Sequence, residues 1–335
     1  MSSSIPLVRA SALCPAELWL IEQGFPAPTW LAEFGLPPSP SLVPDRPVSF
    51  QALLRFLGEM TTRVRPDFGS RISRPDLLLS LGVPATAIRA SRNPREALGL
   101  IARSLHLHAS HVFIRIEQAP GGLLVTEAIA LHSSAIQFHA AHQHVAAIIV
   151  AMGCLATGEP LKTRIRLAPH PELGVAHLER FLGPDVAASS GRMLEIFIPD
   201  FELDQPFPWM PAPMPAGAER QLQPVGRDCL QSSLQELIVG MLEDCEPSLL
   251  RLAKTIGRSK RTLQRQLSRE GTTFAEQVDS VRARRALGQL EQSGQKIAEI
   301  ARFAGYRSSS SLTRAVRRWT DTTPRAFRRV QAMES

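Results

Sequence analysis

The chain has 335 residues, of which 38 are lysine or arginine and 31 are aspartate or glutamate, so its formal net charge is +7 at pH 7. Hydrophobic residues make up 44% of it and charged residues 21%, a balance that supports a buried core and excludes a disordered chain. This length predicts two domains, or a large domain followed by a small one.

The charge is unevenly distributed along the chain. From Ser248 to Ser335 there are 19 basic and 7 acidic residues, a net charge of +12, whereas residues 1–247 carry 19 basic and 24 acidic residues, a net charge of −5. The last quarter of the chain is therefore electrostatically distinct, and its excess of positive charge favours an anionic partner.

The cysteines and the apolar segments indicate the compartment. Cys14, Cys154, Cys229 and Cys245 are widely spaced and form no CxxC pair, so we expect reduced thiols rather than disulfides or a metal cluster. The N-terminus lacks the apolar segment of a secretory signal. The longest apolar run, Val145 to Ala156, is 12 residues long and too short to span a bilayer. These features predict a soluble, cytoplasmic protein with no membrane partner.

A proline-rich stretch separates the two halves of the chain. Gln205 to Pro224 contains six prolines, which disfavour helix interiors and central strands and favour an extended connection. We therefore predict a first domain over residues 1–204, a linker over residues 205–226 and a second domain over residues 227–332. A long surface loop within one domain is the alternative, and the change in charge balance just beyond the stretch favours the linker.

The first domain mixes helical and strand periodicity, which predicts an α+β fold. Two strands, residues 112–117 and 123–131, flank Ala-Pro-Gly-Gly and predict a hairpin with a four-residue turn. The remaining predicted elements are helices over residues 51–64, 134–152 and 175–181 and strands over residues 163–167 and 193–198.

All nine histidines lie between His106 and His177. His139 and His142 have the i, i+3 spacing that could place two metal ligands on one helical face. No Cys, Asp or Glu follows at a matching spacing, so we expect hydrogen-bonded or exposed histidines, with no metal and no cofactor.

The second domain is predicted to be all-α and to contain a helix-turn-helix. Ser248 to Ile256 forms an amphipathic helix, Gly257 supplies the left-handed residue that a tight turn needs, and Ser259 is a natural N-cap for a helix over Lys260 to Arg269. Leu263 and Leu267 face inward on that second helix. A helix, a glycine turn and a capped basic helix together are typical of the helix-turn-helix motif.

The same pattern recurs later in this domain. Lys296 to Phe303 forms a helix, Gly305 turns the chain, and Ser309 to Trp319 forms a second helix that buries Leu312, Val316 and Trp319. Between the two motifs, Phe274 to Gln292 predicts a helix of 19 residues, about 28 Å long. A helix of that length could hold two recognition helices near the separation of about 34 Å between successive major-groove faces of B-DNA.

The residues left outside on each recognition helix are candidates for DNA contact. Arginine can pair with guanine and glutamine with adenine. Short hydroxyl side chains discriminate less between bases, so we expect the second helix to contact mainly the DNA backbone. A solvated face of a basic helical bundle is the alternative, but such a face would mix both signs of charge. The candidates are Lys260, Arg261, Gln264 and Arg265 on the first helix and Ser309, Ser310, Thr313, Arg314 and Arg317 on the second.

At these residues the sequence resembles the AraC/XylS family of transcription regulators. The resemblance covers about residues 230–329, with its most specific motifs in residues 259–274, 281–286 and 297–328. It implies that the outward residues of both recognition helices touch DNA. The family usually has a glycine where this chain has Asp321, which leaves the turn into the last helix open.

Residues 15–208 resemble the N-terminal domain of AraC-type regulators of the ornithine or arginine utilisation and virulence kind. The matching stretches are Phe34 to Pro38, Val64 to Gly69 and Met193 to Pro208. The resemblance implies effector sensing by a domain of the arabinose-binding type and self-association as a homodimer. It also implies activation through RNA polymerase and a bacterial, nucleoid-associated location, and it assigns no effector residues.

The predicted function is therefore a sequence-specific, effector-responsive transcriptional activator that is not an enzyme. One alternative is an enzyme tethered to DNA, such as a regulator of the alkylation-repair kind, which would need an activated cysteine or a metal site. Another is a structural protein that binds DNA without sequence preference.

Overall fold

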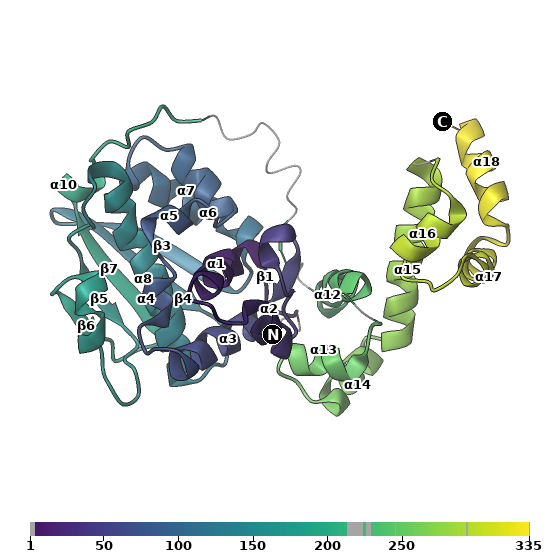
Figure 1. The fold of residues 1–335 in the computed structure, drawn as a ribbon, viewed down its shortest axis with the longest axis horizontal. Helices are drawn as coiled ribbons and strands as arrows, with labels where there is room; N and C mark the ends of the chain where they lie inside the picture. The colour runs from purple at the N-terminus through teal and green to yellow at the C-terminus, as the bar shows by residue number, and fades with distance from the viewer. Residues whose placement is uncertain (1–3, 213–223, 226–228, 245, 293, 335) are drawn as a thin grey trace. The chain divides into compact units, whose positions relative to one another are not determined.

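A computed structural model describes residues 4–212, 224–225, 229–244, 246–292 and 294–334 (Figure 1). The chain divides into two compact units, one comprising Ile5–Arg227 and the other mainly Asp228–Ser335. Cys245 and much of the proline-rich stretch lie outside the described residues. The first unit is α+β and the second all-α, which confirms the predicted fold class.

The first unit contains two β-sheets. Strands β1 and β2 pair in a small antiparallel sheet, and the larger sheet has the order β3-β4-β7-β5-β6, antiparallel except between β5 and β6. The strands are β1 (Leu7–Arg9), β2 (Pro47–Ser49), β3 (Val112–Ala119), β4 (Gly122–Ile129), β5 (Arg164–Leu167), β6 (Val186–Ala188) and β7 (Met193–Pro199).

Helices of varied length surround these sheets. The predicted helix at residues 51–64 is α3, which starts one residue earlier because the Ser49 hydroxyl accepts a hydrogen bond from the Ala52 amide. The helices are η1 (Ala10–Leu13), α1 (Cys14–Glu22), α2 (Ala27–Glu33), η2 (Pro40–Leu42), α3 (Phe50–Arg63), α4 (Phe68–Arg71), α5 (Pro75–Leu78), α6 (Val83–Arg89), α7 (Pro94–His108), α8 (Ala135–Thr157), η3 (Ala176–Leu178), α9 (Glu179–Leu182) and α10 (Asp200–Leu203).

The hairpin turn between β3 and β4 is shorter than predicted. Ala119 pairs with Gly122, so the turn holds only Pro120 and Gly121 rather than four residues. Gly121 has a φ of 77°, and proline followed by a residue of positive φ is the sequence preference of a type II turn. The prediction of four residues was wrong because Ala119 and Gly122 extend the ladder into the turn.

Helix α8 lies in the core of this unit. A capping box at Ser134 and Gln137 starts it, and Gly158 ends it with a φ of 83°. The helix is five residues longer at its C-terminus than predicted. It is the single helix among the described residues that is long and apolar enough to cross a membrane, and 67% of its most apolar window is buried. Its burial against the sheet is what a core helix requires.

The described residues of the second unit form helices joined by turns and loops, without a strand. Helix α15 contacts α12, α16, α17 and α18, so it is the central element of the unit (Figure 1). The helices are α12 (Leu230–Asp244), α13 (Leu249–Thr255), α14 (Lys260–Arg269), α15 (Phe274–Gln292), α16 (Ile297–Phe303), α17 (Ser309–Thr320) and α18 (Pro324–Glu334). The predicted 19-residue connecting helix is confirmed at both ends.

Candidate functional site

The first helix-turn-helix is formed by α13 and α14. Gly257 turns the chain with a φ of 67°, and the Ser259 hydroxyl accepts a hydrogen bond of 3.1 Å from the Thr262 amide at the start of α14. Leu263 and Leu267 are fully buried. Burial of one face of α14 fixes which of its residues point outward.

The outward face of α14 carries the four residues expected from the sequence. Lys260, Arg261, Gln264 and Arg265 are all exposed. Among the described residues, none of the four side chains has an ion-pair or hydrogen-bond partner. Four side chains with free donors therefore line one face of a rigidly capped helix.

The second helix-turn-helix is formed by α16 and α17. Gly305 turns the chain with a φ of 77°, and a Cβ added there would lie 2.5 Å from Leu242 Cδ2. The Ser308 hydroxyl caps α17 by accepting from the Ser311 amide at 3.2 Å. Leu312 and Val316 are fully buried, as predicted, whereas Trp319 is only half-buried. The positive φ favours glycine at this turn, and a Cβ would in addition displace the end of the Leu242 side chain.

The outward face of α17 is less uniform. Ser309, Ser310, Arg314 and Arg317 are exposed, whereas Thr313 is half-buried. The Thr313 hydroxyl donates to the Ser309 carbonyl at 2.8 Å. That hydroxyl can therefore offer DNA only an acceptor, which narrows what α17 can read.

Other arginines of this unit have a structural role. On α15, Arg282 lies 2.9 Å from Glu246 and Arg285 lies 3.1 Å from Glu243, and both side chains are mostly buried. Arg282 and Arg285 thus pair with acids at the end of α12 and just after it. The exposed Arg318 of α17 lies 2.5 Å from Asp279 of α15, whereas Arg261 and Arg265 of α14 have no acidic partner among the described residues.

The turn before the last helix contains a left-handed aspartate. Asp321 ends α17 with a φ of 56°, and its amide donates to the Arg317 carbonyl at 2.9 Å. Asp321 therefore occupies the conformation that favours glycine, and α18 follows at Pro324. The turn into α18 therefore forms without glycine, since aspartate tolerates this region better than most residues.

Replacing Asp321 with glycine should stabilise the second unit. Glycine removes the cost of the left-handed conformation, and it also removes a negative charge from a helix C-terminus. We expect a gain of about 0.5–1 kcal/mol in the free energy of unfolding, measured by urea denaturation. Asp321→Ala is the control, since it removes the same charge but keeps a Cβ; an equal gain in both variants would assign the effect to charge alone.

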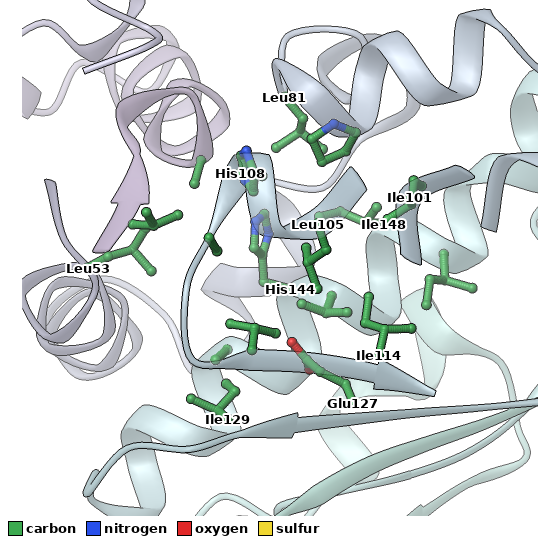
Figure 2. A pocket seen from close by; sticks show the side chains of 18 of the residues that line it. Leu53, Leu81, Ile101, Leu105, His108, Ile114, Glu127, Ile129, His144 and Ile148 are labelled. Atoms are coloured by element: carbon green, nitrogen blue, oxygen red, sulfur yellow. The ribbon is translucent and has the colours of Figure 1, made fainter. Parts of the chain in front are cut away.

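The first unit contains a second candidate site that the sequence did not reveal. A cavity lies between α7, α8 and the hairpin β3–β4, and Glu127, His108 and His144 face it among apolar side chains (Figure 2). Leu123 and Ile129 share the inward face of β4 with Glu127. The signal that could have identified this site in the sequence is Glu127, an acidic residue on the apolar face of a predicted strand.

The paired histidines do not form a metal site in this structure. His139 and His142 are both fully buried, but His139 Nδ1 lies 2.9 Å from the Ala168 carbonyl and His142 Nδ1 accepts from the Ala168 amide. His139 Nε2 instead approaches His177 Nε2 at 3.3 Å. Among the described residues, no group of three metal-type side chains has a geometry that could hold an ion.

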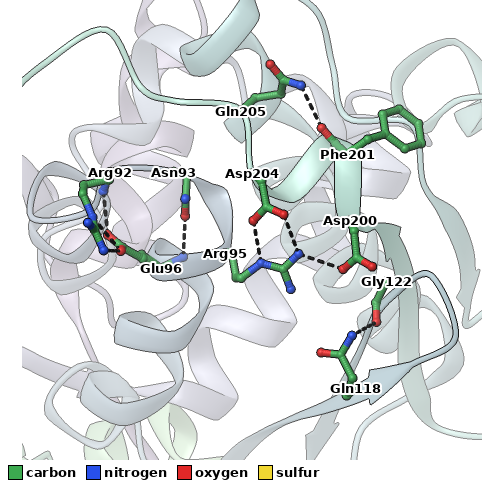
Figure 3. A network of polar contacts seen from close by, with 10 residues as sticks. All are labelled: Arg92, Asn93, Arg95, Glu96, Gln118, Gly122, Asp200, Phe201, Asp204 and Gln205. Atoms are coloured by element: carbon green, nitrogen blue, oxygen red, sulfur yellow. Dashed lines mark hydrogen bonds and ion pairs between the residues drawn. The ribbon is translucent and has the colours of Figure 1, made fainter.

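Helix α7 connects the cavity to the segment that precedes the second unit. Arg95 binds Asp200, the first residue of α10, at 2.7 Å and Asp204, the residue after α10, at 2.6 Å (Figure 3). The start of the proline-rich stretch follows α10, where Phe207 is buried and its amide donates to the Arg92 carbonyl. The first residues of that stretch are therefore attached to the N-terminal unit.

Two family models match the chain. Residues 252–330 match a helix-turn-helix domain, and residues 24–197, just over half of the chain, match the N-terminal arabinose-binding domain of AraC transcription regulators. The two matches fall in the two units separately.

Three relatives carry names of regulators. The chain is 29% identical over 202 residues to the ornithine utilization regulator of Pseudomonas aeruginosa, covering 54% of this chain and 55% of that protein. It is 26% identical over 336 residues to the HTH-type transcriptional regulator VirS of Mycobacterium tuberculosis, covering 96% of each. It is 36% identical over 93 residues to the regulator VqsM of P. aeruginosa, covering 28% of this chain and 29% of that protein. The match thus spans about half the length of the first relative and less than a third of VqsM.

A solved structure also matches over most of the chain. The transcriptional regulator CdpR from Pseudomonas aeruginosa is 23% identical, with a TM-score of 0.34, and the match covers 91% of this chain and 96% of that one.

Proposed function

Because the chain belongs to the AraC family of transcription regulators, we propose that it binds a specific operator by placing α14 and α17 in successive major-groove segments. The carrying observation is the set of exposed, unpaired polar side chains on both recognition helices. Helix α15 supports the assignment, because it is about 28 Å long and connects the two motifs. A direct test is whether a fixed DNA sequence outcompetes random DNA for the full chain.

The two helices are assigned different tasks. Arg261, Gln264 and Arg265 have the donors and acceptors for base edges, and Lys260 extends this face towards the phosphates. Ser309, Ser310, Thr313, Arg314 and Arg317 offer shorter groups or single charges, so α17 is proposed to contribute more to backbone contacts. The base sequence of the operator should therefore vary less in the half that α14 contacts than in the half that α17 contacts.

The N-terminal unit is proposed to sense a small effector and to support dimerisation. The arabinose-binding match and the buried cavity favour this role. Residues 1–204 would form the sensor, residues 205–226 the linker and residues 227–332 the reader. We further propose activation through contact with RNA polymerase in the bacterial cytoplasm, without a cofactor.

The alternative of a DNA-tethered methyl-transfer enzyme is not favoured by the buried Cys14 or the half-buried Cys154. Burial raises the pKa of Cys14 to about 11 and also raises the pKa of Cys154. Such chemistry needs a thiol whose pKa is lowered by a cationic neighbour. Neither cysteine fits that requirement, and the named relatives are regulators.

Binding to random DNA should weaken steeply with salt. The unit carries a charge of +12 over Ser248 to Ser335, and neutralising about six phosphates predicts a loss of roughly a thousandfold in affinity between 50 and 200 mM salt. Fluorescence anisotropy with a labelled random duplex measures this slope. An affinity that is nearly independent of salt would contradict the assignment of α14 and α17 to a phosphate-lined groove.

A further inference from the structure

The cavity of the N-terminal unit is large enough for a small organic molecule. Its volume is about 140 Å³, and an apolar cavity of about 150 Å³ holds a molecule the size of benzene. Leucine, isoleucine and valine side chains form most of its wall, among them Leu53, Leu105, Ile114 and Ile148 (Figure 2). A sugar or a free amino acid would leave several polar groups unpaired against such a wall.

One side of the cavity carries polar groups without partners. Glu127 is 5% exposed, and its Oε2 has no hydrogen-bond partner among the described residues. His108 Nδ1 is also buried without a partner. Figure 2 shows the Glu127 carboxyl directed from β4 towards His144. Buried polar groups are almost always hydrogen-bonded, so these two atoms have unused capacity that a ligand could take up.

Burial favours the neutral form of each of these groups. Burial raises the pKa of Glu127 to about 8. Burial lowers the pKa of His108 to about 4, with a smaller contribution from the Arg9 guanidinium, and burial lowers that of His144 to about 4. His144 Nδ1 is already held at 2.7 Å by the Ser73 hydroxyl. The polar side of the cavity therefore offers uncharged donors and acceptors.

We propose, on the basis of the effector role proposed above, that this cavity binds a small neutral alcohol or phenol whose hydroxyl group hydrogen-bonds to Glu127. The apolar body of such a molecule, about six to ten non-hydrogen atoms, fills the space between α7, α8 and the hairpin. Its hydroxyl both donates and accepts, which matches a carboxyl that can do both.

Charged ligands fit this cavity poorly. A carboxylate would face Glu127, and no lysine or arginine is among the described residues that line the cavity. An amine could bind only by ionising Glu127 and forming a buried ion pair, whose desolvation offsets much of its attraction. The neutral hydroxyl needs no change in charge on either side.

The proposal is tested with four probes that share one ring. Phenol, benzene, benzylamine and benzoate are titrated into the full chain at pH 7 by calorimetry, with thermal unfolding as a second readout. Phenol is expected to bind about tenfold more tightly than benzene, as one additional satisfied hydrogen bond requires. Neither charged probe is expected to bind. Equal binding of phenol and benzene, tighter binding of benzylamine, or binding of none of them would overturn the proposal.

Variants of Glu127 locate the binding. Glu127→Gln keeps a donor and an acceptor and should retain the preference for phenol, whereas Glu127→Leu should bind phenol and benzene within about twofold of each other. Glu117→Gln changes an exposed acid on the neighbouring strand β3 and should alter nothing. Unchanged phenol preference in Glu127→Leu would overturn the site. The glutamine variant and the benzene titration show whether a variant is folded.

Failure of this inference can be told apart from failure of the effector role. If phenol binding depends on Glu127 but leaves operator affinity unchanged, the cavity assignment holds and the effector role is wrong. If phenol changes operator affinity equally in the wild type and in Glu127→Leu, the effector role holds and the cavity assignment is wrong.

Discussion

Replacing Arg261 and Gln264 together with alanine is expected to abolish most of the chain's preference for its operator over random DNA. Both side chains are exposed on α14 and have no partner in the part of the chain that the structure describes, while Leu263 and Leu267 hold the helix in place from its other face. Each bidentate base contact contributes about 1–3 kcal/mol of discrimination. The double variant should therefore lose roughly 30-fold or more in the ratio of specific to random binding.

The matched control is Arg317→Ala on α17. It removes one positive charge from the other recognition helix, so it should weaken binding to operator and random duplexes by similar factors. Gel-shift titrations of both duplexes at one salt concentration give the two ratios. If the Arg261 and Gln264 variant keeps full discrimination, the proposed assignment of base reading to α14 is wrong.

Acidification is expected to unfold the N-terminal unit between about pH 6.5 and pH 4. Burial lowers the pKa of His108, His139, His142 and His144 to about 4 from an ordinary value near 6.5. The unfolded chain takes up these protons first, so the stability present above pH 6.5 is lost as the pH falls towards 4. At 1.36 kcal/mol per pH unit, each histidine contributes at most about 3 kcal/mol, and a domain is typically stable by about 5–15 kcal/mol.

Glu127 acts with the opposite sign. Its pKa is raised to about 8, so its contribution is greatest below its unfolded pKa and decreases as the pH rises from about 4.5 to 8. Because one glutamate opposes four histidines, the histidines should determine how the free energy of unfolding changes at acidic pH. The free energy of unfolding, measured by urea denaturation at each pH, gives the profile directly.

His142→Asn tests the cause of the acid sensitivity. The asparagine oxygen can replace Nδ1 as the acceptor of the Ala168 amide, and asparagine does not titrate. The acid midpoint should therefore move to lower pH. The control is His132→Gln, whose side chain is exposed. A similar shift in both variants would show that burial of His142 is not the cause.

The C-terminal unit could be predicted closely because its signals are local. Gly257 and Gly305 mark turns that need positive φ. Leu263 and Leu267 in α14, and Leu312 and Val316 in α17, are four residues apart, so the outward residues follow by geometry. The expected lengths of α14 and α15 agree with the structure at both ends. Burial then left Lys260, Arg261, Gln264 and Arg265 outside, as expected.

The N-terminal cavity could not be predicted because it depends on contacts distant in sequence. Its wall combines α3, α7, α8 and the hairpin β3–β4, whose packing no local pattern determines. The pattern of β4 did place Glu127 on the inward face, but burial of an acid becomes informative only once the apolar wall around it is known. The short strands β1 and β2 were not predicted for the same reason, since their pairing joins residues about 40 positions apart.

Selection of bound duplexes from a random DNA pool by the full chain tests the central claim most directly. The account predicts enriched sequences with two conserved blocks whose centres lie about one helical turn, roughly 10 base pairs, apart. One block should vary less in base sequence than the other, and this block should be lost when the variant with Arg261 and Gln264 replaced is used. Recovery of DNA with no enriched sequence, at an affinity equal to that of the starting pool, would contradict it.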